Sequence, residues 1–402
     1  MRPLDHDTSP ALAATRARTE AGWLFAASFR PFFLGASLLA ATAVPVWVAV
    51  FLGGVAEVAG LAAPAWHAHE MVFGFLPAAI AGYLLSATPN WSGRLPASGS
   101  SLAGLFGLWL AGRLVPLVAP FGLGAAADAA FPAAMTLVLL REARIKMQGQ
   151  TRHGLTLFPL LAVAAVGHRW FAADYRDYEW AATAARLGIA TGALLIAAVG
   201  GRLVPSFTRN VLARAEAASV PEPYGRYDIA VLIVSSLGLL SWVAAPQHPA
   251  TAILMTAATL ANAIRLWRWR GWLLRQADVL ALHAGYLWLV VGLAMAALAA
   301  EPLALVPPDA GLHALTAGAI GAMTAAVMAR LTVTRGSGRR ADAKLALAAI
   351  LLINIGAFLR VGAPLALDHY MALLIAGTIA WSSGFALLAL AQRPFAWRSL
   401  LS

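Results

Sequence analysis

The sequence predicts an all-α fold, a polytopic membrane bundle of about twelve transmembrane helices. Of its 402 residues, 60% are hydrophobic and only 12% are charged. The mean hydropathy is +0.74, and apolar runs long enough to span a bilayer recur along the chain. A soluble domain carries roughly 25% charged residues, about twice as many. The fold is therefore one in which helices pack against each other in lipid.

Twelve apolar stretches approach the length of about 20 residues that a membrane helix needs. They form a predicted membrane domain over 32–390, which the polar connection at about 206–227 divides into possible halves, 32–205 and 228–390. Residues 1–31 form an N-terminal tail, with either an interfacial helix or no regular structure, and 391–402 form a C-terminal tail. The twelve stretches are 32–53, 66–88, 101–119, 125–141, 155–173, 181–205, 228–245, 249–266, 278–300, 312–332, 343–361 and 366–390.

The distribution of Lys and Arg predicts the orientation. Basic residues follow the second, fourth, sixth, eighth and tenth stretches, whereas the connections at 54–64, 246–248 and 301–311 contain none. Cytoplasmic loops collect Lys and Arg, so both termini are predicted to be cytoplasmic. The same rule explains the net charge of +11, so the expected partner of the basic residues is the lipid bilayer and not a nucleic acid.

The chain contains no cysteine. Disulfides, thiolate-bound zinc or iron–sulfur clusters, thiolate-bound haem and covalently attached c-type haem are therefore excluded. Any metal must be held by His, Met, Asp, Glu or backbone oxygen.

Three ionisable residues, His67, His69 and Glu70, begin the second predicted span. Such groups are costly to bury in lipid and usually mark a functional site, and imidazole is the commonest metal ligand among side chains. If Pro64 takes the first helical position, as proline often does, the two histidines point to nearly opposite sides, with Glu70 on the face of His67. One histidine can then bind a metal while the other serves a second centre or an outer hydrogen bond. The alternative is that both are polar residues in the headgroup layer.

Three more histidines lie at a similar predicted depth, namely His168 near the end of the fifth span and His313 and His369 at the starts of the tenth and twelfth. This clustering predicts a histidine-lined site toward the outer face, which suits a b-type haem held by paired imidazoles. The alternative is the general tolerance of histidine for membrane interfaces. His283 lies toward the opposite, cytoplasmic end of the ninth span beside Tyr286, and belongs either to a second centre or to the buried packing of its helix.

Arg113, Arg202 and Arg209 lie near span ends and are candidate partners of haem propionates, because guanidinium binds carboxylates bidentately. Snorkelling of these side chains to the membrane surface is the alternative. The sequence shows no Ser/His/Asp arrangement, no phosphate-binding loop and no paired carboxylates within the predicted spans.

Seven motifs run from the N-terminal region to the tenth span: FRPFFLGA (29–36), WHAHEMVFGF (66–75), AGYLLSATPNWSG (81–93), LWLAGR (108–113), GGRLVPSFTRN (200–210), LHAGYLW (282–288) and HALTAGAIGAMTAAVMAR (313–330). Together they resemble the NnrS family. Its members are polytopic proteins of the bacterial inner membrane that contain haem and copper and are linked to nitric oxide and nitrosative stress. The resemblance implies metal-binding roles for His67, His69, His283 and His313, and implies none for His168 or His369.

The sequence departs from the family pattern at one place. After the tenth span, family members commonly carry Gly-His-Thr-Gly-Arg, whereas this chain reads Arg335-Gly336-Ser337-Gly338-Arg339. If the missing histidine binds a metal in the family, this protein lacks a ligand. Its predicted place in a cytoplasmic loop favours a surface residue.

The expected function is that of a haem b- and copper-binding membrane protein in nitric oxide metabolism or resistance to nitrosative stress. Nitric oxide is the expected small-molecule ligand, Glu70 the expected residue for tuning the haem, and the electron donor is not identified by the sequence. Redox turnover, sensing and metal handling are all compatible, so enzyme status stays open. The alternatives are a transporter or channel whose histidines line a solute or proton path, and a copper-handling assembly factor.

Overall fold

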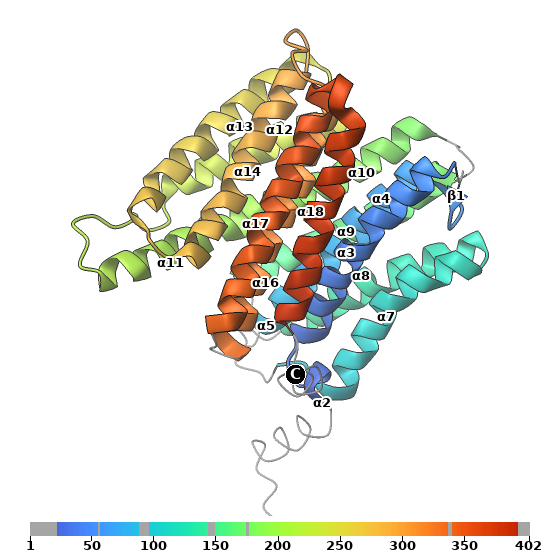
Figure 1. The fold of residues 1–402 in the computed structure, drawn as a ribbon, viewed down its shortest axis with the longest axis horizontal. Helices are drawn as coiled ribbons and strands as arrows, with labels where there is room; N and C mark the ends of the chain where they lie inside the picture. Colours follow the sequence, from blue (N-terminus) through green and yellow to red (C-terminus); the bar gives the residue numbers. More distant parts are fainter. Residues whose placement is uncertain are drawn as a thin grey trace, which may run out of the picture.

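The computed structural model confirms an all-α bundle (Figure 1). It describes residues 22–54, 57–87, 96–143, 149–173, 177–336 and 340–392. Several features predicted from the sequence lie outside these residues: the tail before residue 22, the motif Pro89-Asn90-Trp91, the loop residue Ser337 and the tail after residue 392.

In its described residues the first half of the chain contains six long apolar helices, two of them interrupted, and one small hairpin. The strands of the hairpin pair antiparallel, with Glu57 opposite Ala62. The elements are α2 (Gly22–Phe25), α3 (Arg30–Leu52), β1 (Glu57–Val58), β2 (Leu61–Ala62), α4 (Ala63–His69), η1 (Glu70–Phe75), α5 (Leu76–Ala87), α7 (Gly99–Val118), α8 (Phe121–Ala143), α9 (Gly149–Ala172), α10 (Tyr178–Leu195), η3 (Ile196–Gly200) and α11 (Gly201–Arg214).

The second half contains only helices and the turns that connect them among its described residues. Three of its elements, η4, η6 and η7, are single 3₁₀ turns at helix ends. The elements are α12 (Arg226–Ala244), α13 (Pro249–Arg268), η4 (Gly271–Leu273), α14 (Ala277–Ala299), α15 (Pro308–His313), η5 (Ala314–Gly321), α16 (Ala322–Gly336), α17 (Arg340–Gly362), η6 (Ala363–Leu365), η7 (Leu367–His369) and α18 (Tyr370–Ala391).

Eleven helices in the described part of the chain are long and apolar enough to cross a membrane, and the shorter apolar helix Thr156–Ala172 matches the fifth predicted span. Each of the twelve predicted stretches thus falls on a helix. The sixth differs most, because its helix continues past residue 205 to Arg214. The reason is amphipathicity: Val204, Thr208 and Leu212 recur at a spacing of four and form one buried face, although polar residues lie between them.

Three membrane helices are interrupted by π-helical segments, namely η1, η3 and η5. In a π segment each backbone N–H bonds to the carbonyl five residues earlier, whereas in an α-helix it bonds to the carbonyl four residues earlier. Such segments occur frequently at functional sites. All three lie in helices that are more than half buried within the bundle.

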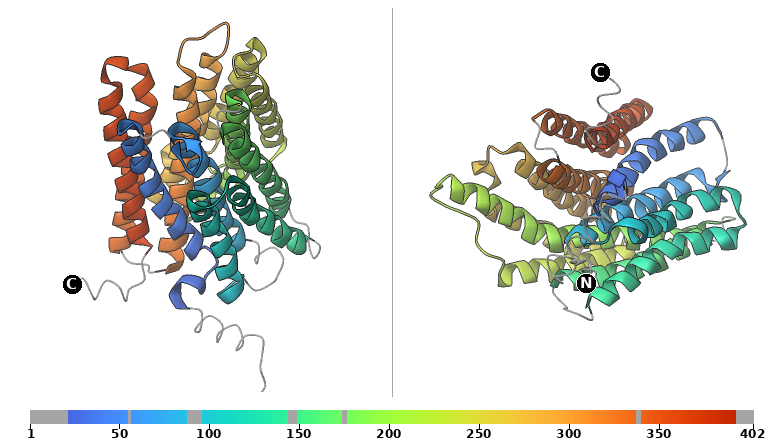
Figure 2. Two further views of the ribbon diagram at one scale, coloured as in Figure 1. Left: turned by 90° about the vertical axis from the view of Figure 1, so that its right-hand side faces the viewer. Right: turned by 90° about the horizontal axis from the view of Figure 1, so that it is seen from below.

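The two halves of the chain pack closely against each other. The first and last spans, α3 and α18, are neighbours, and α10 of the first half contacts η5 of the second. The helices α7 and α8 form a peripheral pair on one flank, whereas α17 and α18 form a pair on another (Figures 1 and 2). The centre of the bundle is therefore built from both halves.

One close approach in this centre depends on a glycine. A Cβ atom at Gly285 in α14 would lie 2.8 Å from the Cα atom of Met323 in α16, which is closer than real Cβ contacts. The absence of a side chain lets the two backbones approach, as small residues do in membrane helix packing.

We expect Gly285→Ala to destabilise the bundle by about 1–3 kcal/mol, because the added methyl group meets backbone that cannot easily move. The matched control is Gly107→Ala in α7, where a Cβ atom meets nothing within 4 Å and alanine favours the helix by up to about 1 kcal/mol. The measurement is the thermal unfolding midpoint in detergent. Equal midpoints for the two variants would contradict the proposed packing.

Candidate functional site

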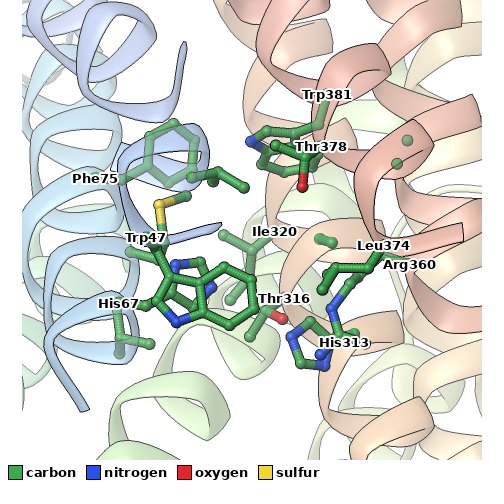
Figure 3. Close-up of a pocket in the computed structure, with 16 residues that line it drawn as sticks. Trp47, His67, Phe75, His313, Thr316, Ile320, Arg360, Leu374, Thr378 and Trp381 are labelled. Carbon is green, nitrogen blue, oxygen red and sulfur yellow. The ribbon is translucent and has the colours of Figure 1, made fainter. Parts of the chain in front are cut away.

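A cleft opens between the two halves of the bundle (Figure 3). It leaves about 670 Å³ of space, its open mouth included. Of this space, about 70 Å³ can take the centre of a water-sized molecule. We call it the central cleft; it is lined by Val44, Trp47, His67, Met71, Val72, Phe75, His313, Thr316, Ala317, Ile320, Gly356, Arg360, Leu374, Gly377, Thr378 and Trp381.

His67 and His313 face the central cleft from different halves of the chain. His67 lies on α4 and its ring stacks on Trp47, with the ring centroids 4.5 Å apart. His313 ends α15, and its Nδ1 atom lies 2.9 Å from the Asp309 carboxylate one turn earlier. The same nitrogen lies 2.9 Å from the backbone carbonyl of Asp309, its hydrogen-bond partner. Holding one imidazole nitrogen in this way leaves the other available as a ligand, as is usual for a metal-bound histidine.

Polar atoms without partners gather around the same cleft. The buried atoms Trp47 Nε1, His67 Nδ1, Arg360 Nη1 and Trp381 Nε1 have no hydrogen-bond partner, and all four residues line the cleft. Arg360 uses its other terminal nitrogen to contact Asp309 at 2.8 Å. Since buried polar groups in native proteins are nearly always satisfied, these orphaned atoms indicate a bound group or ordered water.

His69 lies in a second polar site. Its side chain is fully buried, with Nδ1 3.3 Å from Nδ1 of His168 and Nε2 3.1 Å from the Asp128 carboxylate. The two histidines of α4 thus point into different environments, as expected from the helical period. The helix begins at Ala63, so Pro64 occupies its second position and not the predicted first.

Two arginines neutralise the buried carboxylates beside His69. Arg113 contacts Glu70 at 2.9 Å and Asp128 at 2.6 Å, and Arg169 also pairs with Asp128. The predicted absence of paired carboxylates within the spans is therefore wrong, because Glu70 and Asp128 share one arginine. Asp128 was missed because a single aspartate in a helix of alanines carries no motif.

The position of Glu70 also differs from the prediction. It was expected on the face of His67, but it contacts Arg113 on the side of His69. The backbone is still α-helical at this point, because the Glu70 N–H bonds to the carbonyl of Trp66, so the helical period alone does not decide where the long side chain ends. The ion pair with Arg113 then holds Glu70 on that side.

The remaining predicted residues lie elsewhere. His283 is buried near the connection between α13 and α14, with Nε2 2.9 Å from the Thr208 hydroxyl and its ring edge-on to Trp269. Arg202 lies over the ring of Tyr224 at 4.4 Å, and Arg209 donates to the carbonyl of Pro221 at 3.0 Å, so both hold the connection after α11. His369 is exposed at the start of α18. None of these four residues lines the central cleft.

A further buried arginine, Arg265 in α13, was not singled out from the sequence. It contacts Asp228 at 2.7 Å and donates to the carbonyl of Ala197 at 2.7 Å. It also lies 3.2 Å from the Tyr286 hydroxyl, which donates to Asn262 at 2.6 Å. Every charge in this network has a partner, which is the arrangement required for ionisable groups within a membrane.

No group of three or more His, Asp or Glu side chains in the described part of the chain is arranged to hold a metal ion. The central cleft instead offers two imidazoles from separate helices, an apolar wall and Arg360, one of whose guanidinium nitrogens has no hydrogen-bond partner. This set suits a group that brings most of its own ligands and carries negative charge.

We expect Asp128→Ala to lower the free energy of unfolding by about 3–5 kcal/mol, because it leaves two buried arginines without their shared carboxylate. Glu222→Ala is the matched control. Glu222 pairs with Arg268 at the surface with 73% of its side chain exposed, where such pairs contribute about 0.2–1 kcal/mol. Thermal unfolding in detergent compares the two variants, and a similar small loss in both would show that the Asp128 network is not a stabilising unit.

Comparison with known proteins covers nearly the whole chain. A family model described as NnrS protein matches residues 23–399, a range that contains every membrane-spanning helix and the central cleft. No curated protein matches the chain.

Proposed function

Because this chain belongs to the NnrS family, we propose that it is a haem- and copper-binding integral membrane protein that acts in nitric oxide metabolism or in resistance to nitrosative stress. The observation that carries the proposal is the convergence of His67 and His313 on one apolar cleft between the two halves. Histidines within membrane spans are rare and are a functional site by default.

The donor set of the central cleft fits a haem. A haem supplies four nitrogens of its own, so the protein needs to add only one or two imidazoles. Haem b also carries two carboxylates, and Arg360 presents a buried nitrogen without a partner that can pair with one of them. Arg360 therefore replaces Arg113 as the preferred propionate partner, because Arg113 is already bound to Glu70 and Asp128.

When bound, the haem would supply an iron that can take a diatomic ligand. The side chains of the cleft then have distinct tasks. Asp309 orients the ring of His313, Trp47 holds the ring of His67 by stacking, and the apolar residues between them exclude water. His67 and His313 are the proposed metal ligands.

His69 and His168 are the proposed ligands of copper, since imidazole suits copper. Their Nδ1 atoms lie 3.3 Å apart. This separation is that of a hydrogen bond, and it is also close to the separation of two nitrogens bound at about 2.0–2.1 Å to one tetrahedral metal. Asp128 contacts the other nitrogen of His69 and would orient that ring toward the metal. For His283, the family resemblance is the only argument for a role as metal ligand.

The rival function is that of a transporter, and one observation favours it. The central cleft lies between the two halves of the chain, where transporters built from two bundles bind their substrates. An optical spectrum of the purified protein separates the two functions, because only a haem protein shows a Soret band that shifts on addition of nitric oxide.

We expect His67→Ala and His313→Ala, made singly, each to lose most of the haem or most of the copper, since each removes a metal ligand. The matched control is His248→Ala in an exposed connection. Pyridine haemochrome analysis and elemental analysis measure the two contents separately. Unchanged haem and copper in both cleft variants would refute the ligand assignment, and a wild-type protein without either metal would favour transport.

We place the protein in the bacterial inner membrane with both termini in the cytoplasm. Since the natural chain has no cysteine, single substitutions at exposed positions report orientation without background. We expect Gln247→Cys to react with a membrane-impermeant maleimide in spheroplasts, and Ala218→Cys to react only after permeabilisation. The reverse pattern would show that the termini are outside.

A further inference from the structure

A second cavity adjoins the central cleft on the cytoplasmic side of the bundle centre. It leaves about 610 Å³ of space, its mouth included, and about 70 Å³ in which the centre of a water-sized molecule fits. At roughly 10–15 Å³ for each such molecule, it can hold several small molecules. We call it the apolar cavity.

The lining of the apolar cavity is almost free of polar groups. Of the described residues that form it, only Tyr83 and Thr324 carry a side-chain oxygen. The Thr324 hydroxyl donates to the carbonyl of Ile320 in its own helix at 2.7 Å. Cavities of this kind stay dry and bind small apolar molecules such as xenon or benzene.

A single side chain, Ile320, lines both the apolar cavity and the central cleft. It is 4% exposed and belongs to the π segment η5. Gly192 leaves room for this side chain, because a Cβ atom there would lie 2.8 Å from Cδ1 of Ile320 and 2.9 Å from Cδ2 of Leu76. The two spaces are thus neighbours, and Ile320 is shared by their walls.

The other end of the apolar cavity reaches the surface of the bundle. Part of its lining is buried, including Phe33, Leu76 and Met328. Leu195, Val199, Leu203 and Val327 are only partly buried and form its rim together with Tyr83 and Thr324. An aliphatic rim on a membrane helix faces hydrocarbon more favourably than water.

We propose that the apolar cavity is a binding site for a small apolar molecule that enters from the hydrocarbon layer, and that Ile320 controls its passage to the central cleft. The identity of that molecule as nitric oxide rests on the proposed function. A hydroquinone carrier is disfavoured, since its hydroxyl groups would find few polar partners in this lining. A lipid chain and a hydroquinone are the competing occupants that the experiment must exclude.

The first test needs no metal. Crystals of the full-length protein are pressurised with xenon, and xenon is located by anomalous scattering. We expect a xenon atom between Phe33, Ile196 and Met323 in the wild-type protein. We expect Val327→Trp, which fills the rim, to reduce its occupancy. We expect Val163→Trp to leave it unchanged, because Val163 is 69% exposed on α9, which contributes no residue to the cavity lining.

The second test measures passage. The association rate of nitric oxide with the reduced protein is followed optically for wild type, Val327→Trp and the matched control Val163→Trp. We expect Val327→Trp to slow association several-fold and Val163→Trp to leave it at the wild-type rate. Ile320→Ala removes most of the side chain between the two spaces, so we expect it to speed the association of nitric oxide.

Three results would overturn the inference: no xenon in the wild-type cavity, a lipid or hydroquinone retained there, or equal association rates in the two tryptophan variants. A wild-type protein that holds no haem would instead overturn the proposed function. Xenon occupancy and its loss in Val327→Trp would still be measurable in that case, so the two failures are distinguishable.

Discussion

The buried carboxylate of Asp128 carries the main constraint on the first half of this protein. A charge within a membrane is stable only where it is paired and hydrogen-bonded. Asp128 is held by Arg113, Arg169 and His69 at once, so α4, α7, α8 and α9 must stay in one arrangement. Arg265 imposes the same constraint on the second half through Asp228 and Tyr286. Each network is neutralised within its own half, and the central cleft lies between them.

The charged networks and the π segments depend on each other. A π segment leaves backbone carbonyls that an α-helix would have paired, and in lipid these need other donors. The indole of Trp109 donates to Gly74 in η1 at 2.9 Å, and Arg265 donates to Ala197 in η3. The side chains that neutralise charge or fill the core therefore also stabilise the irregular helices. Those helices in turn provide Met71, Phe75, Thr316 and Ile320 to the central cleft.

The same arrangement links the two histidines of α4. His69 is fixed by Asp128 and His168, and His67 lies two residues earlier on the other side of the same short helix. The polar network thus orients the helix that presents His67 to the cleft. His313 is presented independently, since Asp309 and Arg360 hold it from the second half. The proposed metal centre therefore depends on both halves, and the adjoining apolar cavity connects that centre to the lipid.

The sequence by itself determined the class of fold, the position of the spans and the family. Span length and charge content follow from the thickness and polarity of the bilayer, which act on each helix separately. The motif around His67 and His69 lies on a helix that lines the central cleft, and the opposite directions of the two histidines follow from the helical period. Only the tertiary structure decided that Arg360, and not Arg202 or Arg209, lines the cleft. It also decided that Asp128 and Glu70 contact the same arginine. His283 proved to lie outside the cleft. The physical reason is that these contacts join helices far apart in the sequence and run through π segments, whose shifted register local periodicity does not encode.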